Sequence, residues 1–267
     1  MPTAADRPAA QRWFMLALLA VFVAFSVQYS IKISQDSRLG TQTRSAILRW
    51  RYQVEELVAG KDIYRAYNFP NPPVMTLLLV PLLPLTPLAA GLISYYVKVL
   101  LTLASFAMVF RLVEQSGRPF PVWAKVLTVV LSLRPILGDL SHGNINLLIL
   151  FLVVSALALF RGRRDLSAGV VLALAIACKL TPALFLPYLV WKRAWRALAG
   201  CVVGLVVFFV VVPGLYFGFE ANQRYLTGWV EGMVLPFVRD GQVTPEQNNQ
   251  SDNNGLGASW VSMKWTI

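Results

Sequence analysis

Lys179 is the strongest candidate for a functional residue because of its position. It lies inside an apolar stretch, where a lysine costs about 2.5 to 3.5 kcal/mol on insertion into a membrane. A lysine kept at such a position normally faces a partner or a cavity. Its ammonium can neutralise a phosphate, with further donors from the backbone of a neighbouring helix N-terminus. The alternative is a shallow lysine whose ammonium reaches the membrane interface.

A polar segment at residues 139–146 surrounds the single histidine of the chain, His142. Asn144 and Asn146 lie beside it and can donate and accept hydrogen bonds. One histidine and one aspartate do not make a metal site, so we predict no metal ion. The alternative is that Asn144 only caps the following helix. Arg134, in the preceding apolar segment, is costly for the same reason as Lys179 and is also a candidate.

Two early carboxylates are candidates for a general base. Asp36 follows the first apolar segment almost at once, and Asp62 lies further along the same polar loop. A carboxylate in this place can take a proton from a hydroxyl as it attacks. Each could also be a solvated loop charge. Asp36 is the preferred base and Asp62 the alternative.

A run of side-chain amides near the end of the chain is the last candidate. Asn248, Asn249 and Gln250 can each donate and accept hydrogen bonds, which suits sugar hydroxyls. Amide-rich loops are usually just loops, so this signal gains weight only in combination with the others.

The composition is typical of a membrane protein. Hydrophobic residues make up 57% of the chain and charged residues 14%, against roughly 25% charged residues in a soluble domain. The net charge of +11 is spread among the ends of apolar segments, which argues against a nucleic-acid partner. Cys178 and Cys201 lie inside apolar runs, and their spacing suggests neither a disulfide nor a zinc site.

The apolar segments predict an all-α fold, a polytopic membrane protein with a single integral domain over residues 1–267. Prolines 81, 84 and 87 interrupt one long apolar stretch and predict a short or re-entrant segment there. The expected spans are 13–31, 74–85 (short), 88–110, 123–137, 147–160, 166–178 and 180–191 (two half-helices) and 197–217, with outer loops at 34–73 and 218–251.

Two short basic clusters, at residues 161–164 and 192–196, set the expected orientation, because such clusters mark cytoplasmic ends of spans. If the chain turns back at Lys179, both clusters lie in the cytoplasm. The polar segments 68–73, 139–146, 179–182 and 248–251 then lie on the opposite side. A single traverse would instead place 248–251 in the cytoplasm.

The loop at 34–73 is itself basic. This charge would attract an anionic group such as a lipid phosphate. The alternative is a solvated surface helix over residues 45–59.

Four motifs, taken in order over about residues 13–251, resemble glycosyltransferase family 87. They are Asn71-Pro-Pro-Val-Met, His142-Gly-Asn-Ile-Asn-Leu-Leu, Ala177-Cys-Lys-Leu-Thr-Pro with Leu186-Pro-Tyr-Leu, and Asn248-Asn-Gln-Ser251. This family is similar to the mycobacterial polyprenol-phosphate-mannose-dependent mannosyltransferases. The resemblance implies a GT-C multi-helix bundle in the cell (inner or plasma) membrane. The enzyme would transfer a hexose, here mannose, from a polyprenyl-phosphate donor to a lipid or glycan hydroxyl on the non-cytoplasmic face.

The resemblance also implies an acid in the first outer loop, and Asp36, or alternatively Asp62, matches it. As a hypothesis for the mechanism, Lys179, with His142 or Arg134, would stabilise the charge on the departing phosphate. The amide side chains would bind the acceptor and the sugar: Asn144, Asn146, Asn248, Asn249 and Gln250. No cofactor or metal is expected. The expected partners are the donor, the acceptor and membrane lipids, without nucleic acid.

The end of the chain departs from the family. Family members continue past the Asn-Gln-Ser motif through several more membrane helices, whereas this chain stops at Ile267. The resemblance therefore predicts a truncated product. Two other functions stay open: a transporter or lipid-handling protein built around broken helices, and an inactive fragment.

Overall fold

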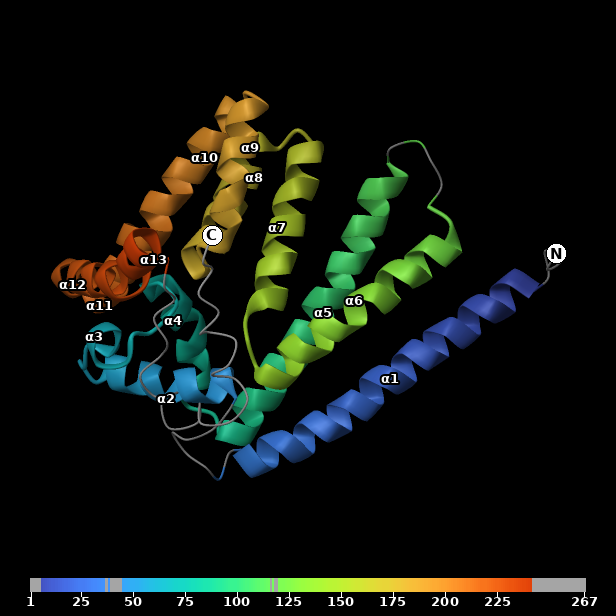
Figure 1. The fold of residues 1–267 in the computed structure, drawn as a ribbon, viewed down its shortest axis with the longest axis horizontal. Coiled ribbons are helices and arrows are strands. Elements are labelled where there is room, and N and C mark those ends of the chain that lie inside the picture. Colours follow the sequence, from blue (N-terminus) through green and yellow to red (C-terminus); the bar gives the residue numbers. More distant parts are fainter. Residues whose placement is uncertain (1–5, 37, 39–44, 116, 118–119, 242–267) are drawn as a thin grey trace.

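The computed structural model describes residues 6–36, 38, 45–115, 117 and 120–241, and every regular element within them is a helix (Figure 1). The predicted all-α class is confirmed. In the described part of the chain, Pro87–Glu114 and Trp195–Phe217 are long and apolar enough to cross a membrane. Together with the composition, these helices make the chain a membrane protein.

The largest part of the molecule is a row of helices whose direction alternates along the chain from α5 to α10 (Figure 1). Neighbours in the row are not always neighbours in sequence, because α7 packs between α5 and α8, and α8 packs against α10. α1 leans against α5 at one end of the row. The row comprises α1 (Asp6–Asp36), α5 (Pro87–Glu114), α6 (Val122–His142), α7 (Asn146–Arg161), α8 (Asp165–Cys178) and α10 (Trp195–Val206).

Glycines bring the backbones of α8 and α10 into close contact. A Cβ atom added to Gly169 would lie 1.9 Å from the carbonyl oxygen of Ala197, and one added to Gly200 would lie 2.2 Å from that of Leu166. Small residues at a helix crossing allow this approach, which is common between membrane helices. The first turns of α8 and α10 are therefore packed backbone against backbone.

We expect Gly169→Ala to lower the free energy of unfolding by at least about 1 to 3 kcal/mol, because the added methyl forces two backbones apart. Gly138→Ala in α6 is the matched control, since a Cβ atom there meets nothing within 4 Å. Thermal unfolding in detergent measures both. Equal midpoints for the two variants would show that α8 and α10 are not in close contact.

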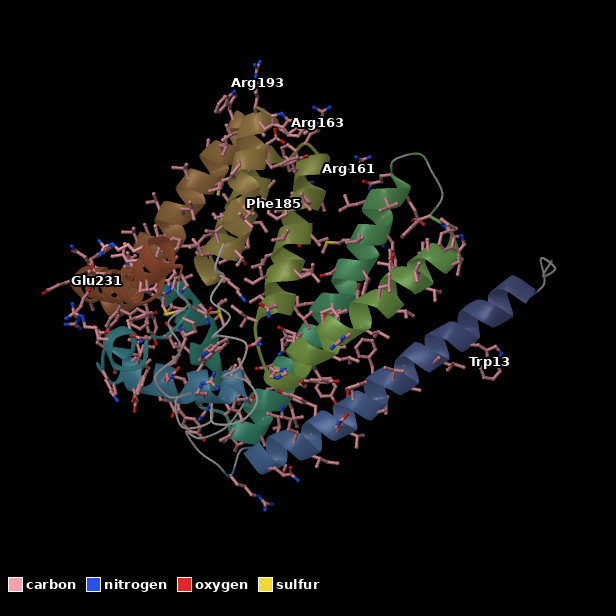
Figure 2. All side chains as sticks on the ribbon, viewed as in Figure 1. Trp13, Arg161, Arg163, Phe185, Arg193 and Glu231 are labelled. Atoms are coloured by element: carbon pink, nitrogen blue, oxygen red, sulfur yellow. The ribbon has the colours of Figure 1, made fainter. Side chains whose placement is uncertain are left out.

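The chain turns back after α8. α8 ends at Cys178, a 3₁₀ turn covers Thr181–Leu184, and α9 (Phe185–Trp191) returns toward the end of the molecule where α8 began. As a result Arg161, Arg163 and Arg193 lie at one end of the row (Figure 2). Lys179 is left at the opposite end, in the reversal itself.

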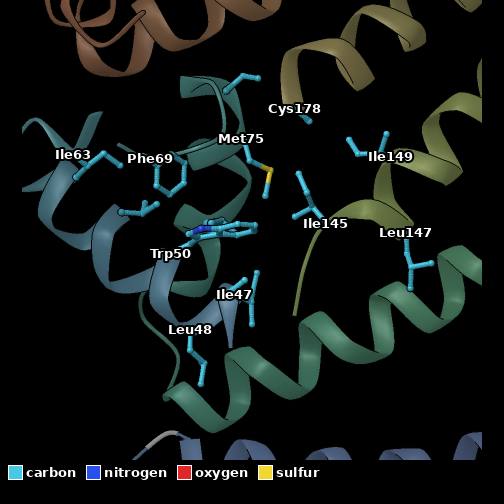
Figure 3. Close-up of a cluster of buried hydrophobic side chains, with 14 of the residues drawn as sticks. Ile47, Leu48, Trp50, Ile63, Phe69, Met75, Ile145, Leu147, Ile149 and Cys178 are labelled. Atoms are coloured by element: carbon cyan, nitrogen blue, oxygen red, sulfur yellow. The ribbon is translucent and has the colours of Figure 1, made fainter. Parts of the chain in front are cut away.

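The basic loop before the row folds into short helices. They are α2 (Ala46–Val58), α3 (Ile63–Tyr67) and α4 (Pro73–Leu79), the last continued by a 3₁₀ turn at Val80–Leu82. The alternative of a helix at 45–59 is right about the helix, but its exposure to solvent is wrong. Most of α2 is buried, including Arg49 and Arg51. Trp50, Met75 and Ile145 join α2, α4 and the start of α7 in one apolar core (Figure 3).

Arg51 explains why the proline-rich segment after α4 is stable at its bend. Its guanidinium donates hydrogen bonds to the carbonyls of Leu82 (3.3 Å), Leu83 (2.7 Å) and Leu85 (2.9 Å). Irregular backbone of this kind needs protein partners when water is excluded. Arg51 also forms an ion pair with the Glu55 carboxylate at 3.0 Å. Its guanidinium is therefore used within the fold, whereas the basic loop had suggested contact with a lipid phosphate.

The end of α10 leads into a helical cap over α3 and α4. Pro213 leaves the carbonyl of Phe209 without its usual helical donor, and Asn222 Nδ2 donates to that oxygen at 2.9 Å. Trp229 Nε1 donates to the Pro70 carbonyl at 3.1 Å, which holds the cap on the loop before α4. The cap comprises π-helical Val207–Val211, α11 (Val212–Phe217), α12 (Phe219–Trp229), π-helical Val230–Val234 and α13 (Leu235–Asp240).

Candidate functional site

Lys179 starts a chain of hydrogen bonds that joins three helices. Its Nζ donates to Oδ1 of Asn146, the first residue of α7. Asn146 Nδ2 in turn donates to Asp139 Oδ1 in the last turn of α6, at 2.7 Å. The backbone N–H of Asn146 points to the same carboxylate oxygen at 3.3 Å. The ends of α6, α7 and α8 are therefore tied together by a lysine, an amide and a carboxylate.

A second lysine reaches the same place from α5. Lys98 is only 6% exposed, and its Nζ donates to the main-chain carbonyl of Asn144 at 3.1 Å. The Asp139 carboxylate is close enough to interact electrostatically with it. Asp139 is itself 7% exposed, and its Oδ2 has no hydrogen-bond partner within the described residues.

These five residues form what we call the polar cluster: Lys98, Asp139, Asn144, Asn146 and Lys179. The Lys98 ammonium interacts with the Asp139 carboxylate, and the Lys179 ammonium is joined to it through Asn146. The cluster therefore carries one excess positive charge when all three groups are ionised. A buried carboxylate oxygen that accepts no hydrogen bond is costly unless a ligand or solvent supplies a donor. The arrangement suits a ligand with a single negative charge and further hydrogen-bonding groups.

A pocket of about 400 Å³ begins at this cluster and runs between α5, α6 and α7. Asp139 and Asn146 lie in its wall, and most of the remaining wall is apolar or carries hydroxyl groups bonded within their own helices, as at Thr102 and Ser105. The pocket therefore has a polar end at Asp139 and Asn146, beside the polar cluster, and a long side that is mainly apolar.

His142 is exposed at the tip between α6 and α7. Its Nδ1 lies 2.7 Å from the Gly138 carbonyl oxygen, which can only accept, so Nδ1–H is the donor in this contact. Gly143 follows in the left-handed region (φ 72°), and a Cβ atom there would lie 2.8 Å from Ser45 Oγ. The tip is thus held closely against the start of α2.

Asn144 does not cap α7, contrary to the alternative considered from sequence. The N-cap residue is Ile145, whose side chain makes no capping bond. Asp139 takes this role from the preceding helix by accepting the N–H of Asn146, and its negative charge favours the helix N-terminus. Asn144 contributes its carbonyl to Lys98 instead.

Arg134 is not brought into the polar cluster. It is exposed on α6 and lines neither the 400 Å³ pocket nor the pocket beside α1. Within the described residues no hydrogen bond or ion pair joins it to Lys179 or His142.

A second pocket, of about 550 Å³, lies between α1, α5 and α6. Gln28, Lys32 and Gln35 line it from successive turns of α1, and Lys32 Nζ donates to the Ser141 carbonyl at the tip. Asp36 is the next residue and the last of α1. Its side chain lies outside what the structure describes, but its backbone ends the helix that forms this pocket.

Asp62 has a structural role away from the polar cluster. Its Oδ1 accepts the N–H groups of Tyr64 (3.1 Å) and Arg65 (3.3 Å) and so caps α3. Oδ2 lies 3.9 Å from Arg224 Nε and has no hydrogen-bond partner in the described chain, so Asp62 stays the alternative base. Burial raises the pKa of the neighbouring Tyr64 hydroxyl well above its usual range, and the Asp62 carboxylate adds to the rise.

We expect Asp62→Ala to lower the free energy of unfolding by about 1 kcal/mol, the usual value of an N-cap. Asp62→Asn should lose less, because an amide oxygen also accepts the two N–H groups. Chemical unfolding of both variants measures the difference. An equal loss in both would show that the charge, and not the cap, is what Asp62 contributes.

The candidates Asn248, Asn249 and Gln250 lie outside the described residues. Within those residues, no group of three or more His, Cys, Asp or Glu side chains is placed to hold a metal ion.

Sequence reasoning missed Lys98 and gave Asp139 no role of its own. Lys98 interrupts the expected span 88–110 and carries the same insertion cost that drew attention to Lys179. The same insertion cost, applied to every lysine in an apolar stretch, would have identified Lys98 as a candidate. The role of Asp139 becomes clear only from its partners, which lie on other helices: Asn146 on α7 and Lys98 on α5.

Comparison with known proteins supports a relation over most of the chain. The model of glycosyltransferase family 87 matches residues 69–263. A polyprenol-phosphate-mannose-dependent α-(1-2)-phosphatidylinositol mannoside mannosyltransferase of Mycobacterium tuberculosis is 33% identical over 159 residues, 54% of this chain and 37% of that protein. The protein of the same name from Mycolicibacterium smegmatis is 32% identical over 215 residues, 74% of this chain and 47% of that protein. The chain thus matches less than half the length of either relative. No solved structure matches.

Proposed function

The chain belongs to glycosyltransferase family 87, and from this premise we propose that it transfers mannose from a polyprenyl-phosphate donor to a hydroxyl of a lipid or glycan acceptor. The two relatives are named for a polyprenol-phosphate-mannose donor and a phosphatidylinositol mannoside acceptor. Phosphatidylinositol mannoside is therefore the first acceptor to test. The observation that supports the proposal is the polar cluster, in which two lysines, two asparagines and one carboxylate lie together with one excess positive charge.

The donor phosphate binds at the polar cluster. A sugar-phosphate-lipid diester carries one negative charge, which equals the excess positive charge of Lys98, Lys179 and Asp139. When the sugar leaves, a second negative charge develops on the phosphate. Ammonium groups already held in place stabilise that charge without reorganisation, which is where such groups contribute most to rate.

The pocket between α5, α6 and α7 takes the first isoprene units of the donor. It begins at Asp139 and Asn146, beside the lysines that would hold the phosphate, and its farther wall is mainly apolar. This direction carries the lipid toward the middle of α5, which is long and apolar enough to cross a membrane.

The acceptor enters beside α1, and Asp36 is its base. Gln28 and Gln35 offer amides for sugar hydroxyls in the 550 Å³ pocket. The acceptor oxygen forms a bond to the anomeric carbon, and its proton passes to Asp36. The bond from that carbon to the phosphate oxygen breaks, with its electron pair staying on the phosphate. Attack from the side opposite the phosphate inverts the anomeric centre.

The polar cluster lies on the non-cytoplasmic side of a cell membrane that the chain crosses several times. Support comes from the arginines of the α7–α8 and α9–α10 turns, which gather at the other end of the helices (Figure 2). Basic turns of this kind favour the cytoplasmic side.

The test is transfer by the purified chain in liposomes, with polyprenyl-phosphate mannose labelled in the sugar and phosphatidylinositol mannoside as acceptor. We expect label in a product that carries a new glycosidic bond, and none from a nucleotide-linked mannose. Donor that crosses the bilayer without a new bond would instead establish a transporter. Donor that neither binds nor reacts would overturn both functions.

A further inference from the structure

A third hollow lies at the end of the molecule opposite the polar cluster. It measures about 1060 Å³ and is formed by the last turns of α5 and α7 together with α9 and the turn after it. It shares no lining residue with the polar cluster or with the 550 Å³ pocket, and it shares Val109 with the far end of the 400 Å³ pocket. Nothing in the transfer of mannose requires it.

The rim of this hollow is strongly basic. Four exposed cationic side chains line it, and the one carboxylate in its lining is Asp165. The cations are Arg161, Arg163, Lys192 and Arg193. Within the described residues none of them forms an ion pair with a carboxylate. Their charge is therefore available to an anionic ligand.

The contacts these cations do make leave most of their donors open. Arg161 Nη2 donates to the carbonyl of Gln115 at 3.1 Å. Lys192 Nζ lies over the ring of Trp191, 4.6 Å from its centroid. A guanidinium has five N–H donors, so Arg161 keeps several for a phosphate.

Two of the arginines occupy backbone positions that favour glycine. Arg163 (φ 61°) follows α7 and Arg193 (φ 52°) follows α9, both in the left-handed region. The two turns have the same hydrogen bonds, with Arg163 N–H donating to Phe160 and Arg193 N–H donating to Val190. Glycine is the usual residue at this place after a helix. The chain has arginine at both, which puts two cations side by side at the rim.

The walls below the rim are apolar and face the bundle. Val109 and Leu112 of α5 and Leu157 and Phe160 of α7 line them. Exposed tryptophans mark the same end, with Trp191 74% and Trp195 63% exposed, as is usual at the level of lipid headgroups. A ligand that fills both parts needs an anionic head and an apolar tail.

We propose that this hollow binds an anionic phospholipid of the leaflet on the arginine side, with its phosphate among Arg161, Arg163, Lys192 and Arg193 and its acyl chains along α5 and α7. Basic pockets between membrane helices are a known way to hold such headgroups. A free phosphate would use the rim but leave the apolar walls uncovered. The charged rim lies at the opposite end of the helices from the polar cluster, and the proposal does not rest on mannose transfer.

The test compares phosphatidylglycerol with phosphatidylcholine of the same acyl chains, added to the purified chain and counted as bound lipid by native mass spectrometry. The variant is Arg163→Gly with Arg193→Gly. It removes two cations and gives both turns the residue their backbone favours, so it should fold. The matched control is Arg164→Gln with Arg196→Gln, which removes the same charge from exposed positions outside the hollow.

We expect phosphatidylglycerol to bind the unchanged chain in preference to phosphatidylcholine. Loss of the two rim arginines should weaken it roughly 10- to 30-fold, at about 1 kcal/mol for each cation. The control should change binding by less than about threefold, because screened charges outside the hollow contribute little.

Three results would overturn the proposal. Equal weakening in both double variants would mean that general charge attraction holds the lipid. Equal binding of the two lipids would mean that only the apolar walls matter. Displacement of phosphatidylglycerol by inorganic phosphate at comparable concentration would make the ligand a free anion. Circular dichroism of each variant establishes that the helices are kept.

Discussion

Lys179→Gln should reduce kcat/KM for the polyprenyl-phosphate donor roughly 100- to 1000-fold, the usual cost of removing one group that stabilises developing charge. The lysine belongs to the polar cluster through Asn146 and faces the phosphate both before and after the sugar leaves. Both parts of kcat/KM should therefore change: KM should rise and kcat should fall. Lys98 remains, which explains why activity is not lost entirely.

Donor binding gives a second measurement that does not need turnover. Polyprenyl phosphate should bind the Lys179→Gln variant more weakly, while Lys179→Arg should keep part of the affinity because the charge is retained. Lys192→Gln removes the same charge from the other end of the molecule and should leave transfer unchanged. Transfer by Lys179→Gln within about threefold of the unchanged chain would remove Lys179 from the donor site, since even one phosphate contact is worth more than that.

Asp36→Asn should reduce the rate of transfer by about 10² to 10⁴ while leaving donor binding intact. An amide of the same shape cannot take the acceptor proton. The phosphate site lies on α5 to α8, so the donor should still bind with its former affinity. The measurement is single-turnover transfer from pre-bound donor, alongside donor binding at equilibrium.

Asp62→Asn is the matched comparison for Asp36. The two carboxylates come from the same loop region, and Asp62 caps α3 through an oxygen that an amide also supplies. We expect Asp62→Asn to transfer mannose at nearly the original rate. Loss of transfer in this variant, with Asp36→Asn active, would exchange the two roles.

The reversal at Lys179 illustrates what could be predicted from sequence. The cost of a lysine in an apolar run and the proline three residues later both indicated a break. The structure places a 3₁₀ turn and the return helix α9 there. The local sequence was sufficient to predict this break, because Lys179 and the proline after it lie at the break itself.

The polar cluster needed the structure for the opposite reason. Lys98 lies in the middle of α5. Because that stretch was predicted as one continuous span, its single lysine was not considered as a candidate. It reaches Asn144 across 46 positions of sequence, and Lys179 reaches Asn146 across 33. Pairings over such separations depend on which helices are neighbours. No local pattern states that α7 packs between α5 and α8.

The buried α2 shows a second limit. Its sequence contains Arg49, Arg51, Glu55 and Glu56, which is typical of a helix on the surface. Arg51 is buried because the proline-rich segment beyond α4 presents three carbonyls that need a donor. The position of α2 therefore depends on the carbonyls that Arg51 contacts, and these cannot be identified from the sequence of α2 alone.

The position of the polar cluster on the non-cytoplasmic side is tested most directly by labelling single cysteines in intact cells with a maleimide that does not cross membranes. His142→Cys marks the tip beside the cluster, and Arg193→Cys marks the basic end; both positions are exposed. Cys178 and Cys201 are buried and should give little background. We predict that His142→Cys is labelled from outside and that Arg193→Cys is labelled only after the membrane is opened. Labelling of Arg193→Cys from outside, with His142→Cys protected until the membrane is opened, would contradict the proposed site.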